Sequence, residues 1–155
     1  KSASYENIIL IDGDLEIDIE QIPFLIKRYE VLNRTVLVGT RWPNIKKKEL
    51  STLNDLGNYS FNFIFNIIYD TNFNDILCCV KIIKKNIIAS LELEKDDFSI
   101  ESEIMAKLAV KKIPVKEINI NYLRRSAKQG KKLKMIHGLS ILSTILETKL
   151  FYKEK

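Results

Sequence analysis

The sequence predicts an α/β fold, a mainly parallel sheet flanked by helices, because short apolar runs alternate with helical patterns along the chain. Residues 8–11 and 35–39 are continuous apolar runs rich in β-branched residues, which is typical of strands buried on both faces. Residues 76–83 form a third run of this kind. In such a sheet, we expect the loops that follow the strands to meet at one edge, where open α/β sheets bind their ligands.

The first two predicted helices lie between these runs. Residues 19–29 have helical apolar spacing, with Asp18 as the expected N-terminal cap. Residues 50–69 are predicted to be largely helical with a break near Gly57. The stripe expected to face the core in the first helix consists of Ile19, Ile22, Leu25 and Ile26.

The last third of the chain predicts a helix over residues 98–110 and, after Pro114, an alternating strand over residues 115–122. A final helix is expected over residues 135–151. The residues predicted to face inward from this final helix are Leu139, Leu142, Leu146 and Leu150.

Bulk properties fit a single domain over residues 1–155 with a net charge of +5. No apolar run has the length of a membrane span. The adjacent Cys78 and Cys79 offer neither a disulfide framework nor zinc-ligand spacing, so we interpret them as small buried residues of a protein in a reducing compartment. The expected location is the cytoplasm, with peripheral contact at the cytoplasmic face of a membrane as an extension of that expectation.

Two charged segments predict ligand binding. Asp12 and Asp14 flank Gly13 directly after the first apolar run, and such a pair can hold Mg²⁺ or Mn²⁺, although Asp-Gly is also a common turn. Residues 124–134 carry basic side chains and no acid, which favours a phosphate-bearing partner. The absence of aromatic residues between these charges argues against nucleic acid.

Several motifs occur in a fixed order along the chain. They are IDGDLE (11–16), GTR (39–41), LGN (56–58), DILCCVK (75–81), ESE (101–103), EININYLRR (117–125) and GKK (130–132). In this order they resemble the family 2 glycosyltransferases of the GT-A type, and most closely the polyprenyl-phosphate sugar transferases related to dolichol-phosphate mannose synthase. The resemblance implies a GT-A-like, Rossmann-related mixed sheet. It also implies that this chain is the C-terminal portion of a catalytic domain without the N-terminal nucleotide-binding strands.

The resemblance assigns roles at the donor. Asp12 and Asp14 would bind Mg²⁺ or Mn²⁺ and, through it, the diphosphate of a nucleotide sugar; Glu16 stands where the family often has a further metal-contacting residue. Arg41 is expected near the donor phosphates, and Asp75 takes the position of a general base or an acceptor-orienting carboxylate.

At the acceptor, the resemblance implies that Arg125, Lys131 and Lys132 bind the phosphate of a polyprenyl or dolichyl lipid. Glu101 and Glu103 are expected to have supporting roles around the site, or to complement the dipole of their helix.

The implied function is therefore metal-dependent, inverting transfer of a sugar from a GDP- or UDP-sugar to a polyprenyl phosphate. Two alternatives stay open: transfer to a glycan or another non-lipid acceptor, and a non-catalytic module whose basic segment binds anionic lipid or nucleic acid. The sequence indicates no oligomeric state, sugar or lipid length.

Overall fold

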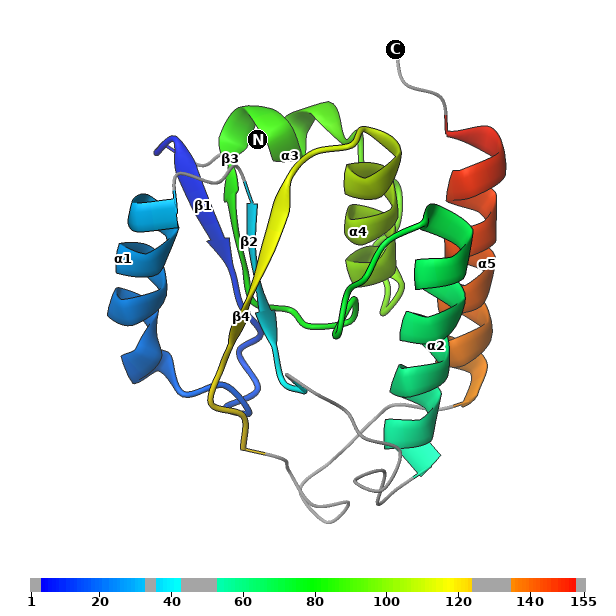
Figure 1. Ribbon diagram of the computed structural model, residues 1–155, viewed down its shortest axis with the longest axis horizontal. Coiled ribbons are helices and arrows are strands. Elements are labelled where there is room, and N and C mark those ends of the chain that lie inside the picture. The colour runs from blue at the N-terminus through cyan, green and yellow to red at the C-terminus, as the bar shows by residue number, and fades with distance from the viewer. Residues whose placement is uncertain (1–3, 33–35, 43–52, 124–134, 153–155) are drawn as a thin grey trace.

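The computed structural model describes residues 4–32, 36–42, 53–123 and 135–152. Figure 1 shows the arrangement of the elements in these ranges. In chain order they are β1 (Asn7–Leu10), a 3₁₀ helix η1 (Ile19–Gln21), α1 (Ile22–Leu32), β2 (Val36–Thr40), α2 (Leu53–Tyr69), β3 (Lys81–Lys84), α3 (Lys85–Ser90), α4 (Ile100–Val110), β4 (Val115–Asn119) and α5 (Met135–Phe151).

Within the described residues, the sheet has four strands in the order β1-β3-β2-β4. β3 pairs antiparallel with both β1 and β2, while β2 and β4 pair in parallel. The α/β class and the flanking helices are thus confirmed, but the prediction of a mainly parallel sheet is wrong. The reason lies after α2, where residues 70–80 contain no helix and return the chain to the other end of the sheet, so that β3 runs opposite to its neighbours.

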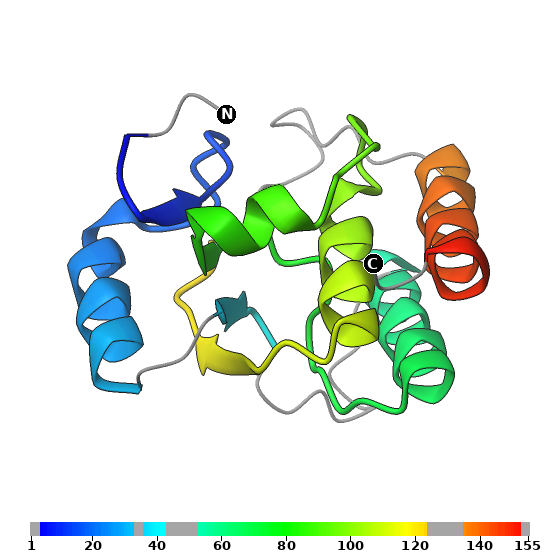
Figure 2. The same ribbon diagram turned by 90° about the horizontal axis from the view of Figure 1, so that it is seen from above.

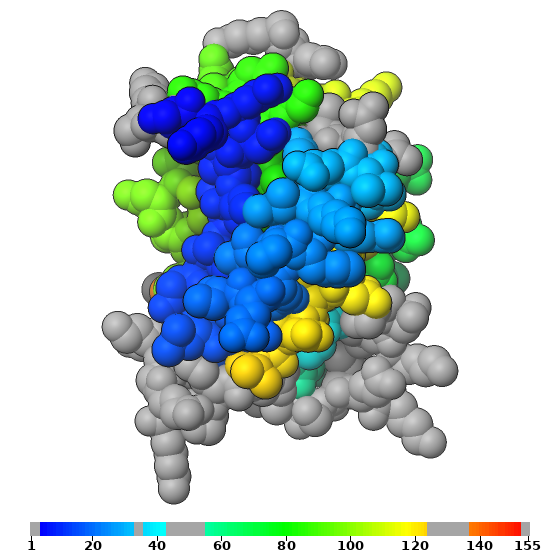
Figure 3. Space-filling model, turned by 90° about the vertical axis from the view of Figure 1, so that its left-hand side faces the viewer, coloured from blue at the N-terminus to red at the C-terminus, as the bar shows by residue number. Residues whose placement is uncertain are grey.

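Helices cover both faces of this sheet. α1 lies against one face, while α3 and α4 lie against the other with α2 and α5 packed outside α4 (Figures 1 and 2). Figure 3 views the molecule from the α1 side, where β1 and its following loop lie beside α1. The alternation along β1 matches these layers, because Ile8 and Leu10 pack into one cluster and Ile9 and Ile11 into the other.

The predicted burial of the first two strands is confirmed for β2, in which every residue is buried. In β1 the residues Ile8, Ile9 and Leu10 are only half-buried, because β1 forms an edge of the described sheet. The third apolar run becomes a strand only from Lys81, and the predicted strand over 115–122 ends at Asn119.

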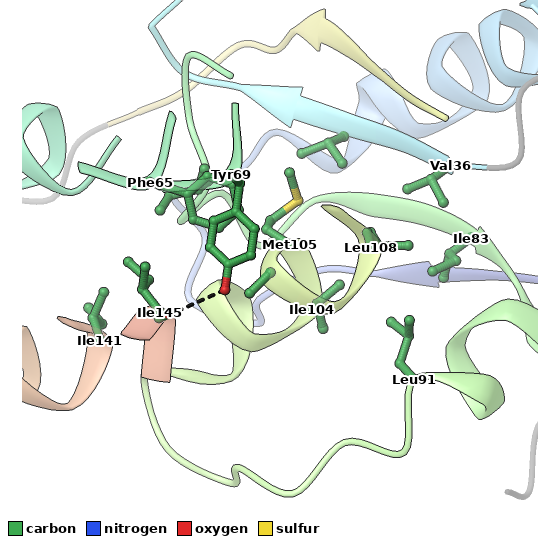
Figure 4. Packing of buried hydrophobic residues seen from close by; sticks show 13 residues of the cluster. Val36, Phe65, Tyr69, Ile83, Leu91, Ile104, Met105, Leu108, Ile141 and Ile145 are labelled. Carbon is green, nitrogen blue, oxygen red and sulfur yellow. Dashed lines mark hydrogen bonds between the residues drawn. The ribbon is translucent and has the colours of Figure 1, made fainter. Parts of the chain in front are cut away.

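The larger core cluster lies between the sheet, α4, α2 and α5 (Figure 4). Phe65 and Tyr69, one turn apart on α2, stack at a centroid distance of 4.4 Å. The Tyr69 hydroxyl donates a 2.8 Å hydrogen bond to the Ile145 carbonyl, which fixes α2 to α5. Burial of the Tyr69 side chain in this cluster raises the pKa of its hydroxyl above the ordinary value.

Helix positions agree with the prediction better than helix faces do. α2 continues through Gly57 without a break, because a helical glycine costs only about 0.5–1 kcal/mol and the packing of the helix outweighs that cost. In α5, Ile141 and Ile145 face the core while Leu139 and Leu150 are exposed, so the predicted inward stripe is wrong. In the first helical region, Leu25 is buried as expected, but Ile19 is exposed and lies in η1.

We expect Phe65→Ala to lower the free energy of unfolding by about 3–5 kcal/mol, because it opens a cavity in this cluster. Phe63→Ala on the same helix is the matched control, since Phe63 is 56% exposed, and it should change stability by about 0.5 kcal/mol or less. Urea unfolding followed by circular dichroism measures both. Equal losses in the two variants would contradict the assigned helix face.

Candidate functional site

One end of the sheet collects most of the predicted site residues. β1, β2 and β4 run in the same direction and finish at this end, whereas β3 runs oppositely and begins there. We call it the site end; it comprises residues 11–16, 41–42, 75–80 and 120–123. Asp12 and Arg41 reach it by following a strand, as predicted. Asp75 lies at the site end for a different reason, because it precedes a strand, β3, that begins there.

Arg41 and Asp75 form a bidentate ion pair at the site end. Arg41 Nε donates to Asp75 Oδ2 at 2.7 Å and Nη2 donates to Oδ1 at 2.8 Å. The Arg41 backbone N–H adds a 3.0 Å bond to Oδ2. Asp75 is fully buried and the Arg41 side chain is 15% exposed, so this pair is largely shielded from water.

The electrostatics of the pair favour the charged guanidinium. Burial alone lowers the pKa of Arg41, but the adjacent Asp75 carboxylate outweighs burial and raises it overall. Two rings also surround the cation: the guanidinium carbon lies 5.6 Å from the Trp42 ring centroid and 5.4 Å from that of Tyr122. Arg41 is therefore fixed by a carboxylate and an aromatic pair together.

The loop that carries Asp75 is held by two asparagines on α2. Asn62 donates to the Asn74 carbonyl and accepts from the Ile76 N–H, both at 2.8 Å. Asn66, one turn later, donates to the Phe73 carbonyl at 2.8 Å and accepts from the Phe73 N–H at 2.9 Å. α2 thus fixes the backbone on both sides of the buried carboxylate.

Glu117 of β4 holds the same loop from the sheet. Its Oε1 accepts from the backbone N–H groups of Asn74 and Asp75 at 2.8 and 3.1 Å, and Oε2 accepts from Asn74 Nδ2 at 2.7 Å. Burial raises the pKa of Glu117 above its ordinary 4.5; the hydrogen bonds oppose this shift and the Asp75 charge reinforces it.

The acidic loop after β1 is organised by local hydrogen bonds. Asp14 Oδ1 accepts from the Glu16 N–H at 3.0 Å, which is an Asx-type turn. Between them, Leu15 has a φ of 63° and is 82% exposed, so the backbone adopts a left-handed conformation that a leucine disfavours. Backbone strain of this kind clusters at ligand-binding loops.

Tyr122 connects this acidic loop to Arg41. Its hydroxyl donates to Glu16 Oε2 at 2.8 Å, and its ring meets Trp42 edge-on at 5.6 Å. The backbone is tied as well, because the Leu123 N–H donates to the Glu16 carbonyl at 2.8 Å and Ile17 bridges to Tyr122. Glu16 is thus fixed by Tyr122, while Asp12 is exposed and Asp14 is half-buried.

Close packing of the strands shapes this end. A side chain at Gly39 would meet Val80 and Ile120 at 3.1 Å, so only glycine fits between them without displacement. Cys78 and Cys79 share a hydrogen bond. This bond, reinforced by burial, raises the pKa of Cys78; the same bond lowers the pKa of Cys79, and burial opposes that lowering. The predicted burial holds fully for Cys78, whereas Cys79 is half-buried and also bonds the Asp12 backbone.

The two glutamates of α4 each have a lysine partner. Glu101 pairs with Lys81, which is fully buried at the start of β3. Glu103 pairs with Lys107 at 2.7 Å, and both side chains are almost fully buried. Glu103 also accepts from the backbone N–H groups of residues 94 and 95, so it holds the loop before α4. These ion pairs balance the charges of both glutamates, and their supporting role around the site stays a prediction.

The remaining predicted residues, Arg125, Lys131 and Lys132, lie outside the described residues. In the part of the chain that the structure does describe, no three His, Cys, Asp or Glu side chains come together as a metal-binding group. Asp12 and Asp14 still suit Mg²⁺, which usually binds through one or two carboxylates and completes its shell with water and substrate phosphates.

The sequence reasoning missed the residues that position the pair. Asn62 and Asn66 are spaced by one helical turn, which places both amides on one face of a helix. Trp42 and Tyr122 are the aromatic residues nearest the ends of two strands. Glu117 occupies an alternating position in a strand, which gives no signal of its contact with a distant loop.

No protein-family model matches the chain, and no curated protein matches it. No helix in the described ranges combines the length and apolar character of a membrane span.

We expect Arg41→Ala to lower the free energy of unfolding by about 3–5 kcal/mol, because it leaves the buried Asp75 carboxylate without its counter-charge. Glu147→Ala is the control, since it breaks the exposed 3.1 Å pair with Lys95 and should cost about 1 kcal/mol or less. Chemical unfolding measures each. The double variant with Asp75→Ala should lose less than the sum of the single variants; additive losses would contradict the coupling.

A second prediction concerns the titration of Glu117. Its carboxyl carbon should titrate above pH 4.5 in an NMR experiment, and Asp75→Asn should lower that midpoint by removing a nearby negative charge. Because the folded pKa is raised, the contribution of Glu117 to stability is greatest below pH 4.5 and declines as the pH rises through the folded pKa. A midpoint at or below 4.5 would disprove the buried placement of this carboxylate.

Proposed function

We propose that this chain carries the metal-binding and acceptor-binding part of an inverting sugar transferase, which moves a sugar from a nucleotide donor to a polyprenyl phosphate. The observation that supports the proposal most is the meeting of the Asp12–Asp14 loop with the Arg41–Asp75 pair at one end of the sheet. The connection runs through Glu16 and Tyr122. The motif resemblance supplies the reaction, since fold alone does not define function.

In this proposal, Asp12 and Asp14 hold Mg²⁺ or Mn²⁺ on the donor diphosphate. With these two carboxylates as its ligands, such an ion would supply positive charge to stabilise the leaving diphosphate. Arg41 adds a second positive charge for the same phosphates. Its pair with Asp75 uses Nε and Nη2, so Nη1 is the guanidinium amino group that Asp75 does not engage.

The acceptor phosphate is the nucleophile. One of its oxygens attacks the anomeric carbon, the bond from that carbon to the diphosphate oxygen breaks, and a single in-line displacement inverts the configuration. An ionised phosphate needs no proton removed before it attacks. Asp75, whose two oxygens bind Arg41, therefore serves as a positioning residue for that guanidinium, and Arg125, Lys131 and Lys132 bind the acceptor phosphate.

We expect Asp12→Asn combined with Asp14→Asn to reduce sugar transfer by about 100-fold or more, because the metal loses its charged ligands. The assay incubates the full-length protein, wild type or variant, with radiolabelled GDP- or UDP-sugars and polyprenyl phosphate. The label that reaches the organic extract is then counted. The amide oxygen that Asp14→Asn introduces can still accept from the Glu16 N–H, so folding should be retained.

Asp70→Asn is the matched control. Asp70 is exposed at the C-terminal end of α2 with a φ of 53°, a conformation that asparagine tolerates. This variant should transfer sugar at the wild-type rate. Unchanged activity in the double variant would disprove the metal role, and label confined to water-soluble product would favour a non-lipid acceptor.

A further inference from the structure

Tyr122 lies between the two charged parts of the site end. β2 and β4 are parallel with Thr40 opposite Asn119, so the residues that follow the two strands leave the sheet side by side. The half-buried Tyr122 side chain donates from its hydroxyl to Glu16 Oε2 at 2.8 Å, and its ring lies 5.4 Å from the guanidinium carbon of Arg41. The polar end of one side chain thus contacts the acidic loop, while its ring contacts the cation.

The hydroxyl end of Tyr122 is connected to Asp14 through Glu16. Asp14 Oδ1 accepts from the Glu16 N–H at 3.0 Å, and the Glu16 carboxylate in turn accepts from Tyr122. The backbone follows the same route, because the Leu123 N–H donates to the Glu16 carbonyl at 2.8 Å and Ile17 bridges to Tyr122. A change at the Asp14 carboxylate is therefore passed to Glu16 and from there to the Tyr122 ring.

The backbone at Leu15 shows why this connection matters for the acidic loop. Its φ of 63° is a conformation that leucine disfavours, and such a conformation persists only where surrounding contacts fix it. The bonds of Glu16 to Asp14 and to Tyr122 fix the residue that follows Leu15. Without the Tyr122 hydroxyl, the turn has fewer contacts to oppose its relaxation, and the Asp14 carboxylate is held less firmly.

We propose that Tyr122 is a positioning residue that couples the acidic loop to the Arg41 guanidinium, so that a divalent cation on the loop changes the surroundings of Arg41 and Trp42. This inference rests on the proposed function, because it takes Asp12 and Asp14 as the ligands of the cation. It adds a link through the protein between the two groups that would bind the donor phosphates. Residues that orient metal-binding carboxylates commonly change metal affinity by about 10–100-fold.

Trp42 provides the readout for this coupling. It is the only tryptophan of the sequence, it meets the Tyr122 ring edge-on at 5.6 Å, and the Arg41 guanidinium carbon lies 5.6 Å from its ring centroid. The test adds Mg²⁺ alone to the full-length protein and follows tryptophan emission. Mn²⁺ affinity is measured separately from the loss of the free-ion electron paramagnetic resonance signal, since Mn²⁺ itself quenches fluorescence. Wild type should bind Mn²⁺ and change its emission with Mg²⁺, and Trp42→Phe should lack that change.

The decisive variant is Tyr122→Phe, which keeps the ring beside Arg41 and removes only the hydroxyl bond to Glu16. It should bind Mn²⁺ about 10-fold more weakly and lose most of the emission change even at saturating Mg²⁺. Tyr29→Phe is the matched control, because the Tyr29 hydroxyl donates at 3.2 Å to Asn7, which lies where β1 begins, at the other end of the sheet. This control should equal wild type in both measurements, and thermal melts establish that both variants fold.

Loss of the emission change in Tyr122→Phe, with a wild-type response in Tyr29→Phe, would support the coupling. Constant wild-type emission in a protein that binds Mn²⁺ would overturn the coupling and leave the metal role of Asp12 and Asp14 in place. A Tyr122→Phe variant that keeps the full emission change would overturn it as well, whatever its affinity. Absence of both Mn²⁺ binding and an emission change would count against the proposed function itself, and the coupling would fail with it.

Discussion

The buried ion pair between Arg41 and Asp75 is the contact on which the geometry of the site end depends. It joins the end of β2 to the loop before β3, two segments that run to this point from opposite directions. A fully buried carboxylate is tolerable only with a counter-charge and several donors, and Asp75 has three bonds from Arg41. The surrounding contacts from α2, β4 and Tyr122 therefore serve to keep this pair in place.

The sequence predicted which residues lie at the site end better than it predicted the strand directions that bring them there. Continuous apolar runs located β1 and β2, and residues placed directly after them, Asp12 and Arg41, were found at the expected end of the sheet. Asp75 was expected there as well, but for the wrong reason, since it precedes an antiparallel strand. Composition reveals an apolar run but not its direction in the sheet, which is fixed by the long connection after α2.

Helix faces show a second limit of sequence reasoning. α5 carries isoleucines and leucines on several sides, so helical periodicity allowed either Leu139 or Ile141 to face the core. Only packing against α4 decides between them. In the same way, three side chains hold the loop that carries Asp75. Asn62 and Asn66 lie on the helix before this loop, and Glu117 lies on a strand far from it in the chain. Such contacts leave no periodic signal in the sequence.

The order of strands in the sheet also has a consequence for how the protein acquires its structure. Every strand pairing in the described sheet joins segments that are distant in the chain, and none of these pairings is closed by a short turn. Long loops must close before such pairings stabilise anything, which slows folding. During synthesis, β1 and β2 lack their shared neighbour until β3 has emerged, and β4 completes the described sheet later still. The site end is thus assembled only when most of the chain has left the ribosome.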